Sequence, residues 1–484
     1  MRQLRWSTVL VALLAASVLT ACSGDGDRPS IPPVAFGPGV PLAPAPAVPK
    51  GATAYQRQLP AVLEQNTAFI GTPDSVQIVA AGSGQTLDTV RPSNPPYLAG
   101  GPVGGAPVAA TINGSRVVVW PFLVTVAAPD LIASAPTSTP PTSTPEASAP
   151  PTSTPPTSVP PTPGANPPLF GGTASALPPS AGEVAVSPST DATASQPDDE
   201  RDDGPPTGNV VELASIRADT HTSTTVLVRL PGWASAATST LSVTAIGAEG
   251  GTVLLGVTDG LAHAALAVDS TSGQTLWTRD NFAVGALVGQ TAVGVAPDSA
   301  LGASVHVAGL DLADGHERWR QLRGYGLHVA SAGPTLVAAI GQLATGPDRN
   351  TFQLLNGETG ALSTKLTVPP APTSSCRYDG TSVSVCYTPA EHPEDRAAAG
   401  FDATTGQQLW AMPDYNTSNK PAPLVTAVWH GLVYATTDGT QTVVFRANNR
   451  TPIRTTPGPA PGVVADQAGV AIDGASIVGR RPIA

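Results

Sequence analysis

Charged residues are scarce in this chain of 484 residues, and cations are scarcer than anions. Only 12% of the residues are charged, and 24 Lys and Arg against 35 Asp and Glu leave a net charge of −11. A chain this acidic lacks the basic surface that binds a phosphate backbone, which argues against a nucleic-acid partner. Lysine occurs at only three positions, while Ala, Gly and Pro are abundant, as is typical of a GC-rich genome.

Cysteine and the common catalytic motifs are also rare or missing. The three Cys and seven His are scattered along the chain, and they do not form two pairs at the spacing that is typical of zinc ligands. The chain has no Gly-x-Ser-x-Gly elbow, no P-loop, no His-Glu-x-x-His and no Gly-x-Gly-x-x-Gly. We therefore predict no catalytic residue, no metal site and no cofactor, and interpret the protein as a non-enzyme.

What is abundant is Gly and Pro, with 49 and 53 residues, about a fifth of the chain. Gly lowers helix stability and Pro removes a backbone donor, so long helices are disfavoured. Turn-rich, all-β structure with disordered stretches is the class that this composition favours.

Residues 1–21 are typical of an export signal, because two arginines precede an apolar stretch, 9–19, that is too short to span a bilayer comfortably. The segment ends in Leu19-Thr20-Ala21-Cys22, which resembles the bacterial lipobox. That resemblance implies a lipoprotein signal peptide, acylation of Cys22 with fatty acids such as palmitate, and a mature protein anchored at the extracytoplasmic face of the cell membrane. A plain transmembrane anchor is the alternative.

Outside the cytoplasm, disulfides are permitted for the remaining pair, Cys376 and Cys386. These residues flank Tyr378-Asp379-Gly380, a hairpin-turn signal, so a cross-strand disulfide is geometrically reasonable. We predict that disulfide, with two buried free thiols as the alternative.

Two segments have the composition of linkers. Residues 22–50 contain eight prolines and few apolar anchors, so we predict a flexible tether. Residues 134–208 contain Pro-Thr-Ser-Thr-Pro three times and cannot bury enough apolar area to fold, so we predict a disordered Pro/Ser/Thr-rich insertion. This insertion is either O-glycosylated or unmodified.

The rest of the chain carries a repeat with Asp, Gly and Trp at relative positions 0, 4 and 8. The complete copies are Asp269, Gly273 and Trp277; Asp311, Gly315 and Trp319; and Asp402, Gly406 and Trp410. Degenerate copies are Asn356, Gly360 and Thr364; Ala80, Gly84 and Asp88; and Arg446, Arg450 and Arg454. From the first complete copy onward, successive copies lie 42, 45, 46 and 44 residues apart, which is the length of one four-stranded propeller blade.

In each copy an apolar strand ends at the Asp, the Gly supplies the positive φ of a tight turn, and the Trp begins the next strand. Stacking such units around an axis buries both faces of every sheet, with the Trp rings as wedges between neighbours. We predict an all-β propeller of four-stranded blades, eight preferred and seven as the alternative. The first part of the propeller occupies residues 51–133 and the remainder occupies 209–484. We expect strands in the C-terminal tail to pair with an N-terminal strand at 52–60 and so to close the ring.

The Ala-x-Asp-x-x-Thr-Gly-x-x-x-Trp pattern of the repeat is similar to the tryptophan-docking motif of the quinoprotein, or PQQ-like, β-propellers. This resemblance is specific over residues 241–456. The family includes PQQ-dependent dehydrogenases, which use a calcium ion and often a vicinal cysteine pair, and non-catalytic envelope lipoproteins. Adjacent cysteines are missing here, and no calcium-binding set is recognisable.

The preferred hypothesis is therefore a lipid-anchored binding scaffold for an envelope protein or polysaccharide, with a quinoprotein-type oxidoreductase or another propeller enzyme as the alternative. The loop 391–395 is interpreted as solvated rather than metal-binding, and Trp233 is a weak candidate for contact with a partner. The repeat tryptophans are interpreted as core wedges.

Overall fold

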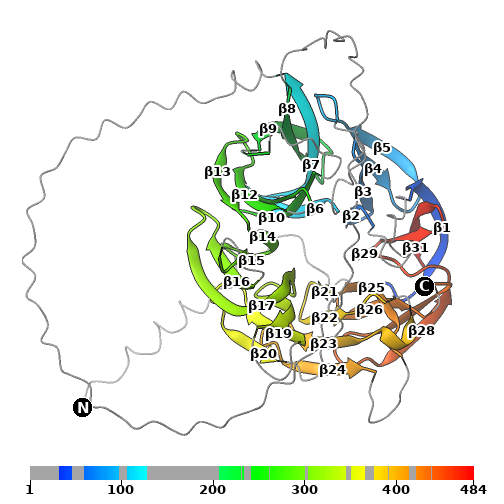
Figure 1. Cartoon of the computed structure of the whole chain (residues 1–484). Coiled ribbons are helices and arrows are strands. Elements are labelled where there is room, and N and C mark those ends of the chain that lie inside the picture. The colour runs from blue at the N-terminus through cyan, green and yellow to red at the C-terminus, as the bar shows by residue number, and fades with distance from the viewer. Residues whose placement is uncertain are drawn as a thin grey trace, which may run out of the picture. The chain divides into compact units, whose positions relative to one another are not determined.

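The computed structural model describes residues 32–45, 59–96, 106–127, 207–230, 232–233, 241–260, 262–299, 304–344, 350–365, 375–390, 392–413, 421–437 and 439–483 (Figure 1). The chain divides into two units, and every described residue belongs to the first, formed by 1–131 and 207–484. The predicted signal peptide, Cys22 and nearly all of the predicted 134–208 insertion lie outside the described residues. Within the described part, no helix has the length and apolar character needed to cross a membrane.

Six sheets contain four antiparallel strands each, which confirms the predicted all-β class built from four-stranded sheets. Three of them precede residue 281: β2 (Ala61–Glu64), β3 (Thr67–Gly71), β4 (Val76–Ala80) and β5 (Gln85–Val90); β6 (Val108–Ile112), β7 (Ser115–Ala127), β8 (Thr207–Arg217) and β9 (Ser223–Arg229); β10 (Ser242–Glu249), β11 (Thr252–Thr258), β12 (His263–Asp269) and β13 (Thr275–Asp280). The other three are β21 (Ser375–Tyr378), β22 (Val383–Tyr387), β23 (Ala398–Asp402) and β24 (Gln408–Met412); β25 (Leu424–Trp429), β26 (Leu432–Thr436), β27 (Gln441–Arg446) and β28 (Pro452–Pro457); β29 (Val463–Ala465), β30 (Ala468–Asp473) and β31 (Ser476–Pro482) with β1 (Phe36–Pro44).

The seventh sheet has seven strands because one long strand pairs with the strand before it along its first half and with the strand after it along its second half. Its strands are β14 (Ala283–Val288), β15 (Thr291–Pro297), β16 (Val305–Asp311), β17 (Glu317–Ser331), β18 (Leu336–Leu343), β19 (Asn350–Asn356) and β20 (Leu362–Lys365). Strand β17 pairs with β16 up to Gly324 and with β18 from Gly324 onward. A Cβ atom on Gly324 would collide with the carbonyl oxygen of Gln342, so the junction requires glycine. The one described helix is a 3₁₀ turn, Pro393–Asp395.

Strand β1 corrects two predictions about the N-terminal segment. Residues 36–44 lie inside the predicted 22–50 tether, yet they pair with β31 and form the outer edge of the sheet β1-β31-β30-β29. Prolines are tolerated there because an edge strand leaves half of its backbone donors unpaired. Phe36 anchors the strand, with its ring 3% exposed and 5.9 Å from that of Tyr434. The N-terminal strand that pairs with the tail is thus 36–44, and not the expected 52–60.

Arg480 holds β1 and β31 to the neighbouring sheet. The buried guanidinium donates to the carbonyl oxygens of Phe36 and Gly37 in β1 and to those of Pro457 and Pro459, at and after the end of β28. Burial lowers the pKa of Arg480 below its usual value. A cation with carbonyl partners from two sheets therefore ties both ends of the folded chain together.

The predicted insertion leaves and re-enters one sheet at adjacent points. Strands β7 and β8 pair along their whole length, from Val117 with Arg217 to Ala127 with Thr207. Residues 207 and 208, predicted to belong to the insertion, lie in β8. Residues 127 and 207, on either side of the segment outside the described residues, are therefore paired at the end of a continuous β-ladder.

Each sheet packs against the next along the chain. Contacts join β6 with β10, β10 with β14, β17 with β21, β21 with β25, β25 with β29, β29 with β2, and β2 with β6. The apolar clusters follow this order, since one combines side chains of the sheets that contain β6–β9 and β10–β13. Middle strands such as β11 and β15 are buried on both faces as a result. Figure 1 shows the sheets of this unit side by side, with β2, β21, β25 and β29 at their inner edges.

Candidate functional site

The Asp of each complete repeat accepts backbone hydrogen bonds in the turn that it begins. Oδ1 of Asp269 accepts from the N–H groups of Thr271 and Ser272, at 3.0 and 2.7 Å. Asp402 accepts in the same way from the two residues that follow Ala403. These bonds hold the pKa of both carboxyls below their usual value. The repeat Gly has φ near +73° in all three copies.

The repeat Trp reaches across to the following copy. Nε1 of Trp277 donates to the carbonyl of Leu312 at 2.7 Å, Nε1 of Trp319 to that of Gly357 at 3.1 Å, and Nε1 of Trp410 to that of Ala447 at 2.6 Å. Trp277 and Trp410 are buried, and Trp319 is half-buried. The rings occupy equivalent places, each bonded to the turn of the following copy.

Two degenerate copies make other hydrogen bonds to a neighbouring copy. Arg450 stands where Gly is expected and has a φ of +52°, and its Nη1 donates back to the carbonyl of Ala411. Thr364 stands where Trp is expected, and its hydroxyl donates to the carbonyl of Gly406. Thr364 thus keeps a hydrogen bond to the following copy where Trp is missing. Arg450 instead adds a bond to the preceding copy, across an interface that already contains Trp410.

Other residues singled out in the sequence have structural environments. Cys376 and Cys386 are opposite each other in β21 and β22 and form a disulfide. Trp233 is 8% exposed and packs in an apolar cluster, which corrects its interpretation as a partner contact. In the loop 391–395, the described residues are on the surface, and the described residues as a whole contain no group of three His, Cys, Asp or Glu side chains placed to hold a metal ion.

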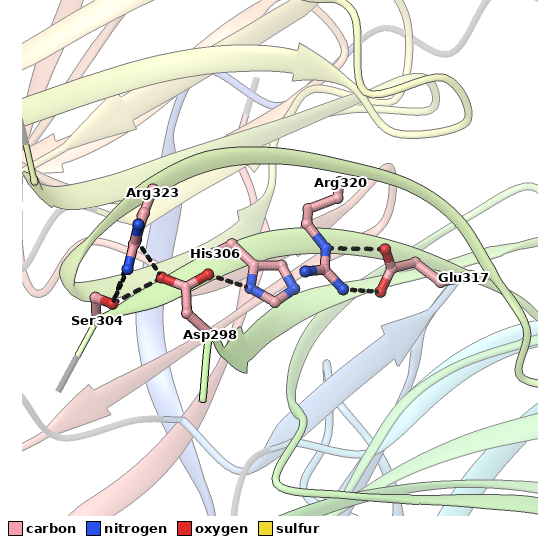
Figure 2. Close-up of polar contacts among 6 residues, drawn as sticks. All are labelled: Asp298, Ser304, His306, Glu317, Arg320 and Arg323. Atoms are coloured by element: carbon pink, nitrogen blue, oxygen red, sulfur yellow. Dashed lines mark hydrogen bonds and ion pairs between the residues drawn. The ribbon is translucent and has the colours of Figure 1, made fainter. Parts of the chain in front are cut away.

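A polar network on β15, β16 and the first half of β17 surrounds Asp298 (Figure 2). Its carboxylate accepts from Ser304 Oγ at 2.7 Å and Arg323 Nε at 2.7 Å, and contacts His306 Nδ1 at 2.9 Å. The Ser304 bond is the largest of the causes that hold the pKa of Asp298 below its usual value. Because Ser304 and His306 both bond to Asp298 and not to each other, the network lacks the serine–histidine contact of a nucleophilic site.

The described residues line a cavity of about 640 Å³. Its lining comes mainly from the edge strands β2, β6, β21, β25 and β29 and the turns that follow them. Arg116 at the start of β7 and Ser331 at the end of β17 complete it. The edge strands contact one another in succession, β21 with β25, β25 with β29, β29 with β2 and β2 with β6. We call this cavity the axial cavity.

Trp429 and His430 form one wall of the axial cavity. Their rings are stacked, with centroids 4.0 Å apart and planes 13° apart. Trp429 Nε1 donates to Asp466 Oδ1 at 3.3 Å, and His430 Nδ1 lies 4.0 Å from the same oxygen. His430 and Gly431 have φ values of +41° and +81°, so this tight turn projects the aromatic pair at the end of β25.

Asp379 in the neighbouring sheet holds that turn. Its carboxylate, fully buried, accepts from the N–H groups of residues 381–383, from the Thr381 hydroxyl and from Gly431 N–H at 3.0 Å. Its backbone carbonyl accepts from His430 N–H at 2.6 Å. One buried carboxylate thereby organises its own turn and the next one.

Glu64 and Arg116, which also line the cavity, form a bidentate ion pair between neighbouring sheets. Arg116 Nη2 lies 2.8 Å from Glu64 Oε1, and Nε contacts both carboxylate oxygens at 3.1 Å. Burial, then the charge of Asp379, raises the pKa of Tyr378, which also lines the cavity. The lining carries two carboxylates, Glu64 and Asp466, and two guanidinium groups, Arg116 and Arg377.

Sequence reasoning identified Tyr378-Asp379-Gly380 and His430-Gly431 only as turns. The glycine in each turn, Gly380 or Gly431, favours a positive φ and is the sequence signal for a hairpin. No spacing in the chain indicates that the turn at 379, the turn at 430 and Asp466 meet at one cavity. Trp429 lies outside the repeat, and no motif in the sequence predicts it as a site.

The quinone and calcium ion that the family resemblance implies do not fit this cavity. Glu64 is engaged by Arg116, and the oxygens of Asp379 are occupied by five donors. The disulfide joins residues ten apart and is not a vicinal pair. The donors that remain do not form a calcium-binding set, which needs six or more oxygens.

Comparison with known proteins finds no matching family model and no matching curated protein. Similar solved structures include BamB from Moraxella catarrhalis, at 14% identity over 57% of this chain and 82% of that chain, with a TM-score of 0.37. A quinohemoprotein alcohol dehydrogenase from Pseudomonas putida HK5 matches at 10% identity over 92% and 76%, with a TM-score of 0.40, and the Dos1 propeller at 8% over 57% and 74%, with a TM-score of 0.36. These neighbours include propellers, and at such scores they carry no argument about what this chain binds or does.

Proposed function

We propose that the folded part of this chain is a closed β-propeller of eight blades. Six blades are the four-stranded sheets, and the seven-stranded sheet supplies two more that share β17 around Gly324. The succession of contacts from β2 through β29 and back to β2 supports a ring. Pairing of β1 with β31 supports closure by the two ends of the chain.

The function that we propose for this ring is a binding scaffold at the extracytoplasmic face of the cell membrane, tethered by a lipid on Cys22. The observation that carries the proposal is the axial cavity, because residues from six sheets line one volume, and aromatic and polar residues are among them. A closed ring of sheets makes such a site rigid, and rigid sites bind without an ordering cost.

Capture from solubilised envelopes tests the proposal. The full-length lipidated protein, Trp429→Ala and Tyr325→Ala are immobilised in parallel and exposed to detergent-solubilised envelopes of the source organism. Tyr325 is a suitable control because it is an exposed aromatic residue, 47% accessible, that does not line the cavity. We expect material retained by the wild type and Tyr325→Ala but lost by Trp429→Ala. Equal retention by all three proteins would remove the cavity from the proposed function.

An activity assay separates the scaffold from the enzyme alternative. PQQ, calcium and an artificial electron acceptor are added to the full protein with alcohols and sugars as substrates. We expect no oxidation above the background of the protein-free mixture. Substrate oxidation that requires all three additions would overturn the scaffold proposal.

A further inference from the structure

We propose that the axial cavity binds an uncharged saccharide chain. This inference rests on the proposed binding function and specifies its ligand class. It draws on three properties of the lining: an aromatic wall, polar groups with remaining hydrogen-bonding capacity, and balanced charge.

The aromatic wall is Trp429, with Tyr378 in the neighbouring sheet. Sugar rings bury their C–H faces against aromatic side chains, and Trp and Tyr combine such apolar area with a polar end. Stacking on His430 fixes the plane of the indole, and the bond from its Nε1 to Asp466 fixes its rotation. A half-buried Trp held by two neighbours loses little freedom when a ligand packs against it.

The polar groups match hydroxyl ligands. Asp466 is exposed, and a carboxylate has about four acceptor positions, of which Trp429 Nε1 uses one. Glu64 engages Arg116 through Nε and Nη2, while a guanidinium has five N–H donors in all. A carboxylate or a guanidinium group presents several acceptors or donors in one plane, which suits the adjacent hydroxyls of a sugar ring.

The balance of charge favours an uncharged ligand. Two carboxylates and two guanidinium groups line the cavity, so neither an anion such as phosphate nor a cation meets an excess of the opposite charge. The volume of about 640 Å³ lies within the usual range of small-ligand pockets, about 300–1,000 Å³. A short run of sugar units fits this size, whereas a stable protein interface covers a broader surface, about 800 Å² per partner.

Direct binding to defined oligosaccharides tests the inference. The full-length protein in detergent is titrated with maltohexaose, α-1,6-mannohexaose and chitohexaose, using saturation-transfer NMR to detect contact and calorimetry to measure Kd. We expect saturable binding of at least one. Trp429→Ala should weaken that binding at least tenfold, Trp429→Phe should retain most of it, and Tyr325→Ala should leave it unchanged. Circular dichroism confirms that each variant is folded.

Three results would overturn the saccharide inference: binding of none of the three probes, unchanged binding by Trp429→Ala, or tighter binding of a sulfated hexasaccharide than of any neutral probe. These outcomes are separable from failure of the scaffold. Trp429-dependent capture of envelope protein, with no oligosaccharide binding, would leave the scaffold in place with a protein partner. Loss of both signals would remove both proposals.

Discussion

The contact between Trp277 and Gly315 permits a quantitative test of packing between the repeats. The indole of Trp277 is 9% exposed, and an added Cβ on Gly315 would lie 2.8 Å from it. Trp277→Ala removes a large side chain from a packed interface and should cost about 3–5 kcal/mol of unfolding free energy.

Gly315→Ala should destabilise for two separable reasons. Its φ of +73° costs an alanine about 1–2 kcal/mol, and the clash with Trp277 adds about 1–3 kcal/mol. Gly114 provides a matched control, because its φ is +76° and no atom lies within 4 Å of an added Cβ. Gly114→Ala should therefore show the backbone cost alone.

The double variant decides between packing and backbone strain. Without the indole, the clash disappears, so Gly315→Ala in the Trp277→Ala background should cost no more than Gly114→Ala in the wild type. The expected coupling is about 1–3 kcal/mol, obtained from urea midpoints at unchanged slope. An equal cost of Gly315→Ala in both backgrounds, or a neutral Trp277→Ala, would refute the wedge interpretation.

Three further predictions rest on the structure and one on the sequence. Arg480→Met should lower stability by about 2–4 kcal/mol, because it leaves carbonyls at both ends of the chain unsatisfied, and hydrogen exchange should then show faster opening of β1; unchanged exchange would contradict this. Replacement of residues 136–206 by a short Gly/Ser linker should leave the melting temperature unchanged, since Ala127 and Thr207 are already paired; a marked drop would show that the segment packs. Hydrogen bonds lower the folded pKa of Asp402, so its contribution is present above pH 3.8 and is lost as the pH falls through the lowered folded pKa; Asp402→Asn should therefore flatten the acid limb of stability against pH. Cys22→Ala should abolish lipid labelling and release the protein from membranes or leave the precursor unprocessed, and a cleaved, membrane-retained variant would argue against the lipobox.

The sequence by itself determined the class of fold and its repeating unit. Asp, Gly and Trp at offsets of 0, 4 and 8 are local requirements of a turn between two strands, so residues such as Asp269, Gly273 and Trp277 predict that turn without knowledge of any neighbour. A repeat length near 45 residues then predicts four strands per unit.

Only the tertiary structure decided which segments become partners. The Pro-rich residues 36–44 form a strand because the ring of Phe36 packs against that of Tyr434 and because Arg480 donates hydrogen bonds to their backbone carbonyls. Each of these contacts joins residues about 400 positions apart in the chain. Local composition predicts a tether there because it contains no information about those distant groups. The axial cavity is decided in the same way, since Glu64, Trp429 and Asp466 come together only when the inner strands of separate sheets meet.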